Sequence, residues 1–255
     1  MLLCIDIGNS NIVLGLYRGE EMRYNWRIST DHDKMPDEYA VLMRNLFEQA
    51  QVRIENLEGI VMASVVPPLT GVFQELAASY FGRTPLVVDA GVKTGVRVRT
   101  DNPREVGADL VVDAAAVYRL YGGPACIVDF GTATKFIAVS AEGDFLGVAI
   151  APGVRISAEA LYRSTAKLPR IDLSRPPSVI GRNTTHSMQS GLLFGFVAMV
   201  EGMVARFREE LGEDMRVIAT GGLAPMIAGE TSCIELVDPW ITLKGLRLVW
   251  ELNRA

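Results

Sequence analysis

The chain has 255 residues, of which 49% are hydrophobic and 22% charged, and its formal net charge is −5. This length and apolarity allow a substantial core, whereas the mild negative charge and the lack of a Lys/Arg run argue against nucleic acid or an anionic membrane as a partner. Three scattered cysteines without CxxC spacing indicate reduced thiols. Without a basic leader or a membrane-length apolar run, we expect a cytoplasmic chain.

Strand-sized apolar runs alternate with helix-sized periodic segments in the first half, as is typical of the α/β class. The pattern predicts strands in residues 2–8, 11–20, 22–29, 59–68 and 85–91 and helices in 36–52 and 70–82. Pro67 and Pro68 are expected to stop the fourth strand. The run NPRE predicts a helix start, with Asn102 as the N-cap and Pro103 in the first position.

The second half repeats the opening of the first. ACIVDFGTATKF, from Ala125, again gives an apolar strand, an Asp-x-Gly turn and a second strand. A constant offset of 123 places Asp6 on Asp129, Gly8 on Gly131 and Asn11 on Thr134. Any hairpin with an Asp-x-Gly turn could look similar, but both copies open a half of similar size. We therefore predict two related α/β domains, 1–122 and 123–255, facing a central cleft.

The two turns have the chemistry of phosphate binding. Gly, Asn and Ser can direct several N–H and side-chain donors to one point, and glycine lets the backbone approach closely. The carboxylate of Asp6 would repel phosphate unless a hard cation such as Mg²⁺ lay between them. In a third motif, IATGGLAP, a strand leads into Gly221 and Gly222 and then a helix, which suits close approach of a nucleoside.

These motifs, in this order, resemble the acetate kinase–sugar kinase–Hsp70–actin superfamily, whose two ribonuclease-H-like domains clamp ATP. The finer resemblance is to the type III pantothenate kinase family, which phosphorylates pantothenate in the first step of coenzyme A synthesis. DIGNSN resembles the first phosphate motif of that family, and DFGTATKF the second. NPREVGADL resembles its pantothenate motif, and GRNTTHSMQSG its substrate-contacting loop and helix.

The resemblance implies a role for each matching residue. Asp109 would be the catalytic base, and Asp129 would bind a monovalent cation, K⁺ or NH₄⁺. Substrate contacts would come from Gly107, Ala108, Asp109, Leu110 and Thr184. ATP contacts would come from Asp6, Ile7, Gly8, Asn9, Ser10, Asn11, Ile12, Val13, Thr132, Gly221 and Gly222, with Asp6 as a possible Mg²⁺ ligand. A homodimer with ATP and pantothenate as ligands is also implied.

Each assignment has a structural alternative. Asp109 could be a solvated helix carboxylate, Thr184 or Asn183 an N-cap, and Lys135 either a phosphate ligand or a solvated strand residue. Two positions depart from the family pattern. Leu110 replaces the usual arginine after the aspartate, and Thr100 stands where many relatives have tyrosine. Both affect substrate affinity more than reaction type, and Arg104 or Arg155 could compensate.

A helix expected from Ser187 to Leu211 carries a stripe of small residues that suits close packing on another helix. These residues are Gly191, Gly195, Ala198, Gly202 and Ala205. Each glycine costs roughly 1 kcal/mol of helix stability against alanine. The packing partner could be the helix after Asn102 or, as the family implies, a second subunit. Rival functions are another small-alcohol kinase of the superfamily and a nucleotide-binding regulator without turnover.

Overall fold

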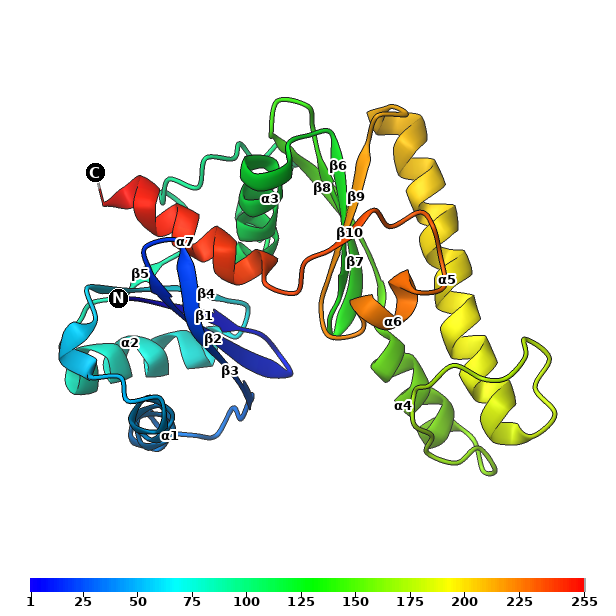
Figure 1. Cartoon of the computed structure of the whole chain (residues 1–255), viewed down its shortest axis with the longest axis horizontal. Helices are drawn as coiled ribbons and strands as arrows, with labels where there is room; N and C mark the ends of the chain where they lie inside the picture. The colour runs from blue at the N-terminus through cyan, green and yellow to red at the C-terminus, as the bar shows by residue number, and fades with distance from the viewer. Residues whose placement is uncertain (255) are drawn as a thin grey trace. The chain divides into compact units, whose positions relative to one another are not determined.

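A computed structural model describes residues 1–254, which form two compact units (Figure 1). Unit 1 contains Met1–Ala116 and the segment that begins at Ile241, and unit 2 contains Val117–Trp240. Each unit is built on a five-stranded mixed sheet, and the two sheets have the same order of strands. The duplication predicted from the Asp-x-Gly repeat is therefore present at the level of topology.

The sheet of unit 1 has the order β3-β2-β1-β4-β5. β1 (Leu2–Ile7), β2 (Asn11–Arg18) and β3 (Glu21–Ser29) form an antiparallel meander, and β4 (Gly59–Ser64) and β5 (Leu86–Val87) continue the sheet in parallel. The helices are α1 (Pro36–Gln49), α2 (Pro67–Phe81), the first part of α3 (Ala108–Tyr121) and α7 (Ile241–Asn253). Short 3₁₀ turns lie at Ile54–Asn56 and Pro103–Glu105.

The alternation of side chains along β1 explains where its one carboxylate points. Leu3, Ile5 and Ile7 belong to the buried cluster that also contains residues of α1 and α2. Because successive strand residues point to opposite faces, Asp6 lies on the other face of the sheet. An apolar first strand thus holds one carboxylate at its carboxyl end, away from the main core of the unit.

Unit 2 repeats the scheme, with the sheet order β10-β9-β6-β7-β8. Its strands are β6 (Ala125–Phe130), β7 (Ala133–Val139), β8 (Phe145–Pro152), β9 (Arg216–Thr220) and β10 (Leu236–Val237). Its helices are α4 (Val154–Ser164), α5 (Thr184–Leu211) and the short α6 (Ala224–Ala228). Cys126, Val128 and Phe130 pack in one cluster with residues of α5, which leaves Asp129 on the opposite face of the sheet.

The C-terminal helix corrects the predicted domain boundary. The sequence analysis assigned all of 123–255 to the second domain, but α7 packs against β1, β2 and β4 of unit 1. Gly59 makes this close packing possible, since a Cβ there would lie 2.1 Å from Cη2 of Trp250. The boundary near residue 122 moves to between Ala116 and Val117, inside α3.

Three predicted element boundaries also shift. Pro67 does not stop a strand, because β4 ends at Ser64 and Pro67 is the first residue of α2, where its missing N–H costs nothing. The NPRE segment forms only a 3₁₀ turn, and α3 begins at Ala108. The long helix begins at Thr184 instead of Ser187. Each shift brings a helix N-terminus to a residue of the predicted site or close to it.

Helix α5 is long and apolar enough to cross a membrane by length and composition alone. Its buried residues Leu193, Val197, Val200 and Val204 belong to the core of unit 2. This packing explains its apolarity as that of a core helix.

Candidate active site

The first Asp-x-Gly turn is held by hydrogen bonds within the turn and to Thr30, and its polar side chains are exposed. The backbone N–H of Gly8 donates to the carbonyl of Asn11 at 3.0 Å, and the hydroxyl of Thr30 donates to the carbonyl of Gly8 at 2.6 Å. The backbone N–H of Thr30 also donates to the carbonyl of Ser10 at 3.1 Å. Asn9, Ser10 and Asn11 are exposed. A loop held from two sides can present several donors to one anion without reorganising.

The second Asp-x-Gly turn is one residue shorter. Gly131 donates its N–H to the carbonyl of Ala133 at 3.1 Å, as Gly8 does to Asn11. The offset of 123 therefore holds through Gly131 and becomes 122 after the turn, so the counterpart of Asn11 is Ala133. The predicted match of Asn11 with Thr134 was wrong, and Thr134 is fully buried. Thr132 is exposed within the turn.

The shorter turn sets Lys135 directly opposite Asp129 across β6 and β7. Their side chains form an ion pair, with 2.9 Å between Nζ and Oδ2, and both are less than one fifth exposed. Lys135 is thus not the solvated strand residue considered from the sequence, and its contact with phosphate stays a prediction. In the first hairpin the position opposite Asp6 is taken by Val13, which carries no charge.

The Gly-Gly turn lies against this ion pair. Gly221 has φ +91°, in the left-handed region that favours glycine. A Cβ at Gly221 would lie 2.6 Å from the carbonyl oxygen of Phe130 and 2.8 Å from Oδ1 of Asp129. Two motifs that are far apart in sequence therefore meet in unit 2, and Gly221 is required there for space as well as for backbone conformation. Gly222 is exposed beside it.

The Gly-Ala-Asp segment forms the start of α3. Asp109 lies in the first helical turn, is half-buried, and accepts the N–H of Leu110 through Oδ1 at 2.9 Å. A Cβ at Gly107 would lie only 2.5 Å from this Oδ1. Gly107 is therefore needed to leave the carboxylate in place. Leu110, at the position of the family's arginine, is buried and brings no charge.

A cavity of about 770 Å³ in unit 1 is lined by Gly107 and Ala108. Its wall contains eight valines: Val65, Val87, Val88, Val92, Val96, Val98, Val106 and Val111. Arg104 lines it too, whereas the other candidate arginine, Arg155, lies on α4 of unit 2. The sequence analysis missed the valine wall, although the alternation Val92, Thr94, Val96, Val98 in VKTGVRV was a usable signal.

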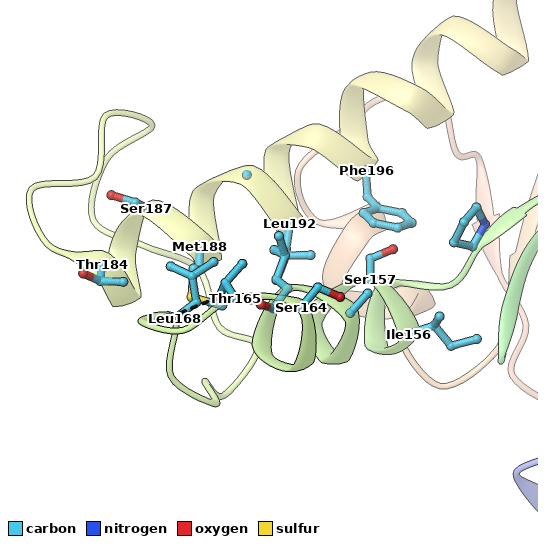
Figure 2. Close-up of a pocket in the computed structure, with 14 residues that line it drawn as sticks. Ile156, Ser157, Ser164, Thr165, Leu168, Thr184, Ser187, Met188, Leu192 and Phe196 are labelled. Carbon is cyan, nitrogen blue, oxygen red and sulfur yellow. Dashed lines mark hydrogen bonds between the residues drawn. The ribbon is translucent and has the colours of Figure 1, made fainter.

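Thr184 lines a different cavity, of about 880 Å³, between α4 and α5 in unit 2 (Figure 2). The cavity is mainly apolar, with Ile156 from α4 and Met188, Leu192 and Phe196 from α5 among its labelled residues. The N-cap of α5 is Asn183, whose side chain accepts the N–H of His186 at 2.8 Å. Thr184 is not the cap.

The small-residue stripe of α5 is exposed. A Cβ at Gly191, Gly195 or Gly202 would meet nothing within 4 Å, and Ala198 and Ala205 are also exposed. Most of the helix after Asn102 belongs to unit 1, so its packing on these glycines stays a prediction.

Residues 1–254 contain no cluster of three His, Cys, Asp or Glu side chains that could hold a metal ion. Mg²⁺ in proteins is often bound through one or two carboxylates, with its other oxygen ligands supplied by water and substrate phosphates. Asp6, on the rim of the first turn, has the ligand chemistry for such shared coordination of Mg²⁺.

Comparison with known proteins agrees with these motifs. The family model described as type III pantothenate kinase matches residues 2–206. The chain is 51% identical to the type III pantothenate kinase of Moorella thermoacetica, over 99% of this chain and 100% of that one. It is 50% identical to the enzyme of Exiguobacterium sibiricum, over the full length of both.

Among solved structures, a Campylobacter jejuni protein named for the Baf family of transcriptional activators superposes with a TM-score of 0.62. It is 15% identical and the match covers 99% of this chain and 98% of that one, so this likeness shows the fold alone. The duplicated sheet, the ordered motifs and the full-length identity lead to one assignment: the chain belongs to the type III pantothenate kinase family.

Proposed function

We propose that this chain transfers the γ-phosphoryl group of ATP to the 4′-hydroxyl of pantothenate, the first step of coenzyme A synthesis. The observation that carries the proposal is Asp109 in the first turn of α3, next to a cavity lined by Gly107 and Ala108. The names and full-length identity of the relatives support the same substrate.

Asp109 is proposed as the catalytic base. A loose phosphoryl-transfer transition state needs an oriented alcohol and a late acceptor for its proton, and little more. The hydrogen bond from Leu110 fixes Oδ1 of Asp109, and Gly107 leaves the space around it open. The apolar wall of the cavity suits the gem-dimethyl group beside the reacting carbon of pantothenate. Arg104 is proposed to offset the missing arginine at position 110 by attracting the substrate carboxylate.

The phosphates of ATP are proposed to bind at the two Asp-x-Gly turns. Residues 6–13 supply backbone and side-chain donors at the first turn, and Thr132 supplies a hydroxyl at the second. Gly221 and Gly222 give the adenosine a surface without side chains. Mg²⁺ bound with ATP, with Asp6 as its protein ligand, would neutralise phosphate charge. The proposal also includes a positive charge beside Asp129, which the resemblance assigns to K⁺ or NH₄⁺.

We further propose a homodimer, supported by the exposed stripe of α5. Small residues without neighbours on a long helix suit close contact with a second subunit. The adjoining apolar cavity exposes Ile156 and Leu161 of α4, and Ile180 before α5 is 81% exposed. Thr184 and Gly191, the first residue of the stripe, both line this cavity, so a second subunit bound here would lie beside the proposed pantothenate contact and complete that site. The net charge of −5 and the absence of a Lys/Arg run support an enzyme that binds neither nucleic acid nor an anionic membrane. The three cysteines without CxxC spacing support a cytoplasmic location.

The test is the conversion of pantothenate to 4′-phosphopantothenate, measured by mass spectrometry for the wild type and for Asp109→Asn. Loss of the base should lower kcat on the order of 10²–10⁴-fold while ATP affinity is retained. Asp101→Asn, at an exposed carboxylate eight positions earlier in the chain, is the matched control and should retain activity. Near-normal turnover by Asp109→Asn would remove it as the base.

A nucleotide-binding regulator without turnover remains the second candidate. The observation in its favour is the uncharged, buried Leu110 at the motif's arginine position. ATP binding with no product from pantothenate would support it. Turnover with another alcohol instead of pantothenate would identify a different kinase of the superfamily.

A further inference from the structure

The ion pair between Lys135 and Asp129 occupies the place where the family resemblance predicts a monovalent cation. The two residues are direct partners across β6 and β7, so their side chains leave the sheet on the same face. Nζ lies 2.9 Å from Oδ2, a distance typical of a charge-assisted hydrogen bond from an ammonium group to a carboxylate. The side chains are 18% and 15% exposed, so the pair is largely withdrawn from solvent.

The surroundings of Asp129 do not fit an additional cation. Backbone from two turns closes on the carboxylate: a Cβ at Gly221 would lie 2.8 Å from Oδ1, and one at Gly131 would lie 3.3 Å from Oδ2. A free K⁺ or NH₄⁺ at Oδ2 would have to displace the Lys135 ammonium or lie beside it, where two like charges repel. The residues present therefore disagree with the implied soluble cation.

We infer that the ammonium group of Lys135 takes the place of that cation, so that this enzyme turns over without K⁺ or NH₄⁺. This inference rests on the proposed function. This replacement keeps the chemistry of the site, because the lysine side chain ends in an ammonium group that is positively charged and donates hydrogen bonds as NH₄⁺ does. The difference is that this ammonium group is attached to β7 and does not have to bind from solution. Tethering also removes the entropic cost of capturing a free ion, since the charge is already in place when ATP binds.

The first experiment measures wild-type turnover of pantothenate in a buffer whose only monovalent cation is tetramethylammonium, which is too large for the site. The ionic strength is held at about 0.1 M while KCl or NH₄Cl replaces the tetramethylammonium salt. The inference predicts the same kcat/KM in all three salts. Strong stimulation of the wild type by K⁺ or NH₄⁺ would overturn it.

The second experiment uses Lys135→Met, which keeps the apolar stem and removes the charge. In tetramethylammonium its kcat/KM should fall on the order of a hundredfold, as when one preorganised charge is lost, and NH₄⁺ or K⁺ should restore much of it. The double variant Asp129→Asn with Lys135→Met has no carboxylate to hold an ion and should not be rescued. A Lys135→Met enzyme that is fully active and indifferent to salt would contradict the inference.

Lys34→Ala is the matched control, because Lys34 forms a lysine–aspartate pair with Asp31 at 2.8 Å in unit 1. It should show neither the loss nor the rescue. ATP affinity, measured by calorimetry in the same salts, gives a readout that needs no turnover. Salt-independent ATP binding by the wild type, with NH₄⁺-dependent binding by Lys135→Met, supports the inference even if pantothenate is not the substrate, whereas salt-dependent wild-type binding opposes it.

Discussion

The two Asp-x-Gly hairpins are built on the same plan but differ at the residue opposite the aspartate. Asp6 faces Val13 across β1 and β2, whereas Asp129 faces Lys135 across β6 and β7. A one-residue difference in turn length produces part of this change, because it shifts the register after the turn. The comparison teaches that a duplicated scaffold can give its two carboxylates different surroundings. Asp129 is paired with the ammonium group of Lys135, whereas we propose that Asp6 binds the Mg²⁺ that arrives with ATP.

Substitutions of the two aspartates are expected to show the largest functional difference between the hairpins, measured as the loss of kcat/KM. Asp6→Asn removes the proposed Mg²⁺ ligand and should lower kcat/KM for ATP on the order of 10²–10³-fold, as loss of a transition-state charge does. Asp129→Asn keeps the Lys135 ammonium, which is the charge proposed to act on ATP, so its loss of kcat/KM should be smaller, although the unpaired and largely buried ammonium should lower the free energy of unfolding. Steady-state kinetics at saturating pantothenate measure both. Equal losses would mean that the hairpins are functionally equivalent.

The glycines that adjoin the hairpins should differ in their tolerance of a side chain. Gly221→Ala places a Cβ 2.6 Å from backbone of Phe130 at a positive φ and should reduce the free energy of unfolding by about 3 kcal/mol. Gly8→Ala brings its Cβ 3.0 Å from the carbonyl of Asn11, without a positive φ, and should cost less than about 1 kcal/mol. Urea denaturation of both variants checks this. The reverse order would show that the first turn is the more tightly packed.

A lysine at position 13 would give the first hairpin the same Asp–Lys pair as the second and so remove the difference between them. Val13→Lys puts an ammonium group opposite Asp6, where it should compete with Mg²⁺. The Mg²⁺ concentration for half-maximal turnover should rise about tenfold, corresponding to roughly 1.4 kcal/mol. Val13→Met serves as the neutral control of similar length. An unchanged Mg²⁺ requirement in Val13→Lys would show that Asp6 does not hold the metal.

The smallest effect concerns the hydrogen bond to the first turn from Thr30, which directly follows β3. Thr30→Val removes the hydroxyl that donates to the carbonyl of Gly8 at 2.6 Å and should reduce stability by about 1 kcal/mol. Because the donors of this turn would then be less fixed, the KM for ATP should also rise modestly. Thermal unfolding and ATP titration report the two effects separately. A stability loss with unchanged KM would make Thr30 purely structural.

The sequence was sufficient to predict both hairpins, because each has a continuous apolar run of strand length that ends in Asp-x-Gly and is followed by a second apolar run. The sequence was insufficient to predict the unit to which α7 belongs. The apolar face of a helix indicates that it is buried, but it does not indicate which of two similar sheets it covers. The contact of Gly221 with Asp129 depends on two loops from distant parts of the chain. The pairing of Lys135 with Asp129 could have been predicted from the sequence. The sequence analysis assumed turns of equal length in the two hairpins, and that assumption gave the wrong register for the strand that carries Lys135.

The most direct measurement is ADP production by the purified chain with ATP and Mg²⁺, in the presence and absence of D-pantothenate, with the product identified by mass. The account predicts ADP release that depends on pantothenate and a product heavier by one phosphoryl group. ATP binding without pantothenate-dependent ADP release would contradict it and would leave a nucleotide-binding regulator on the same fold.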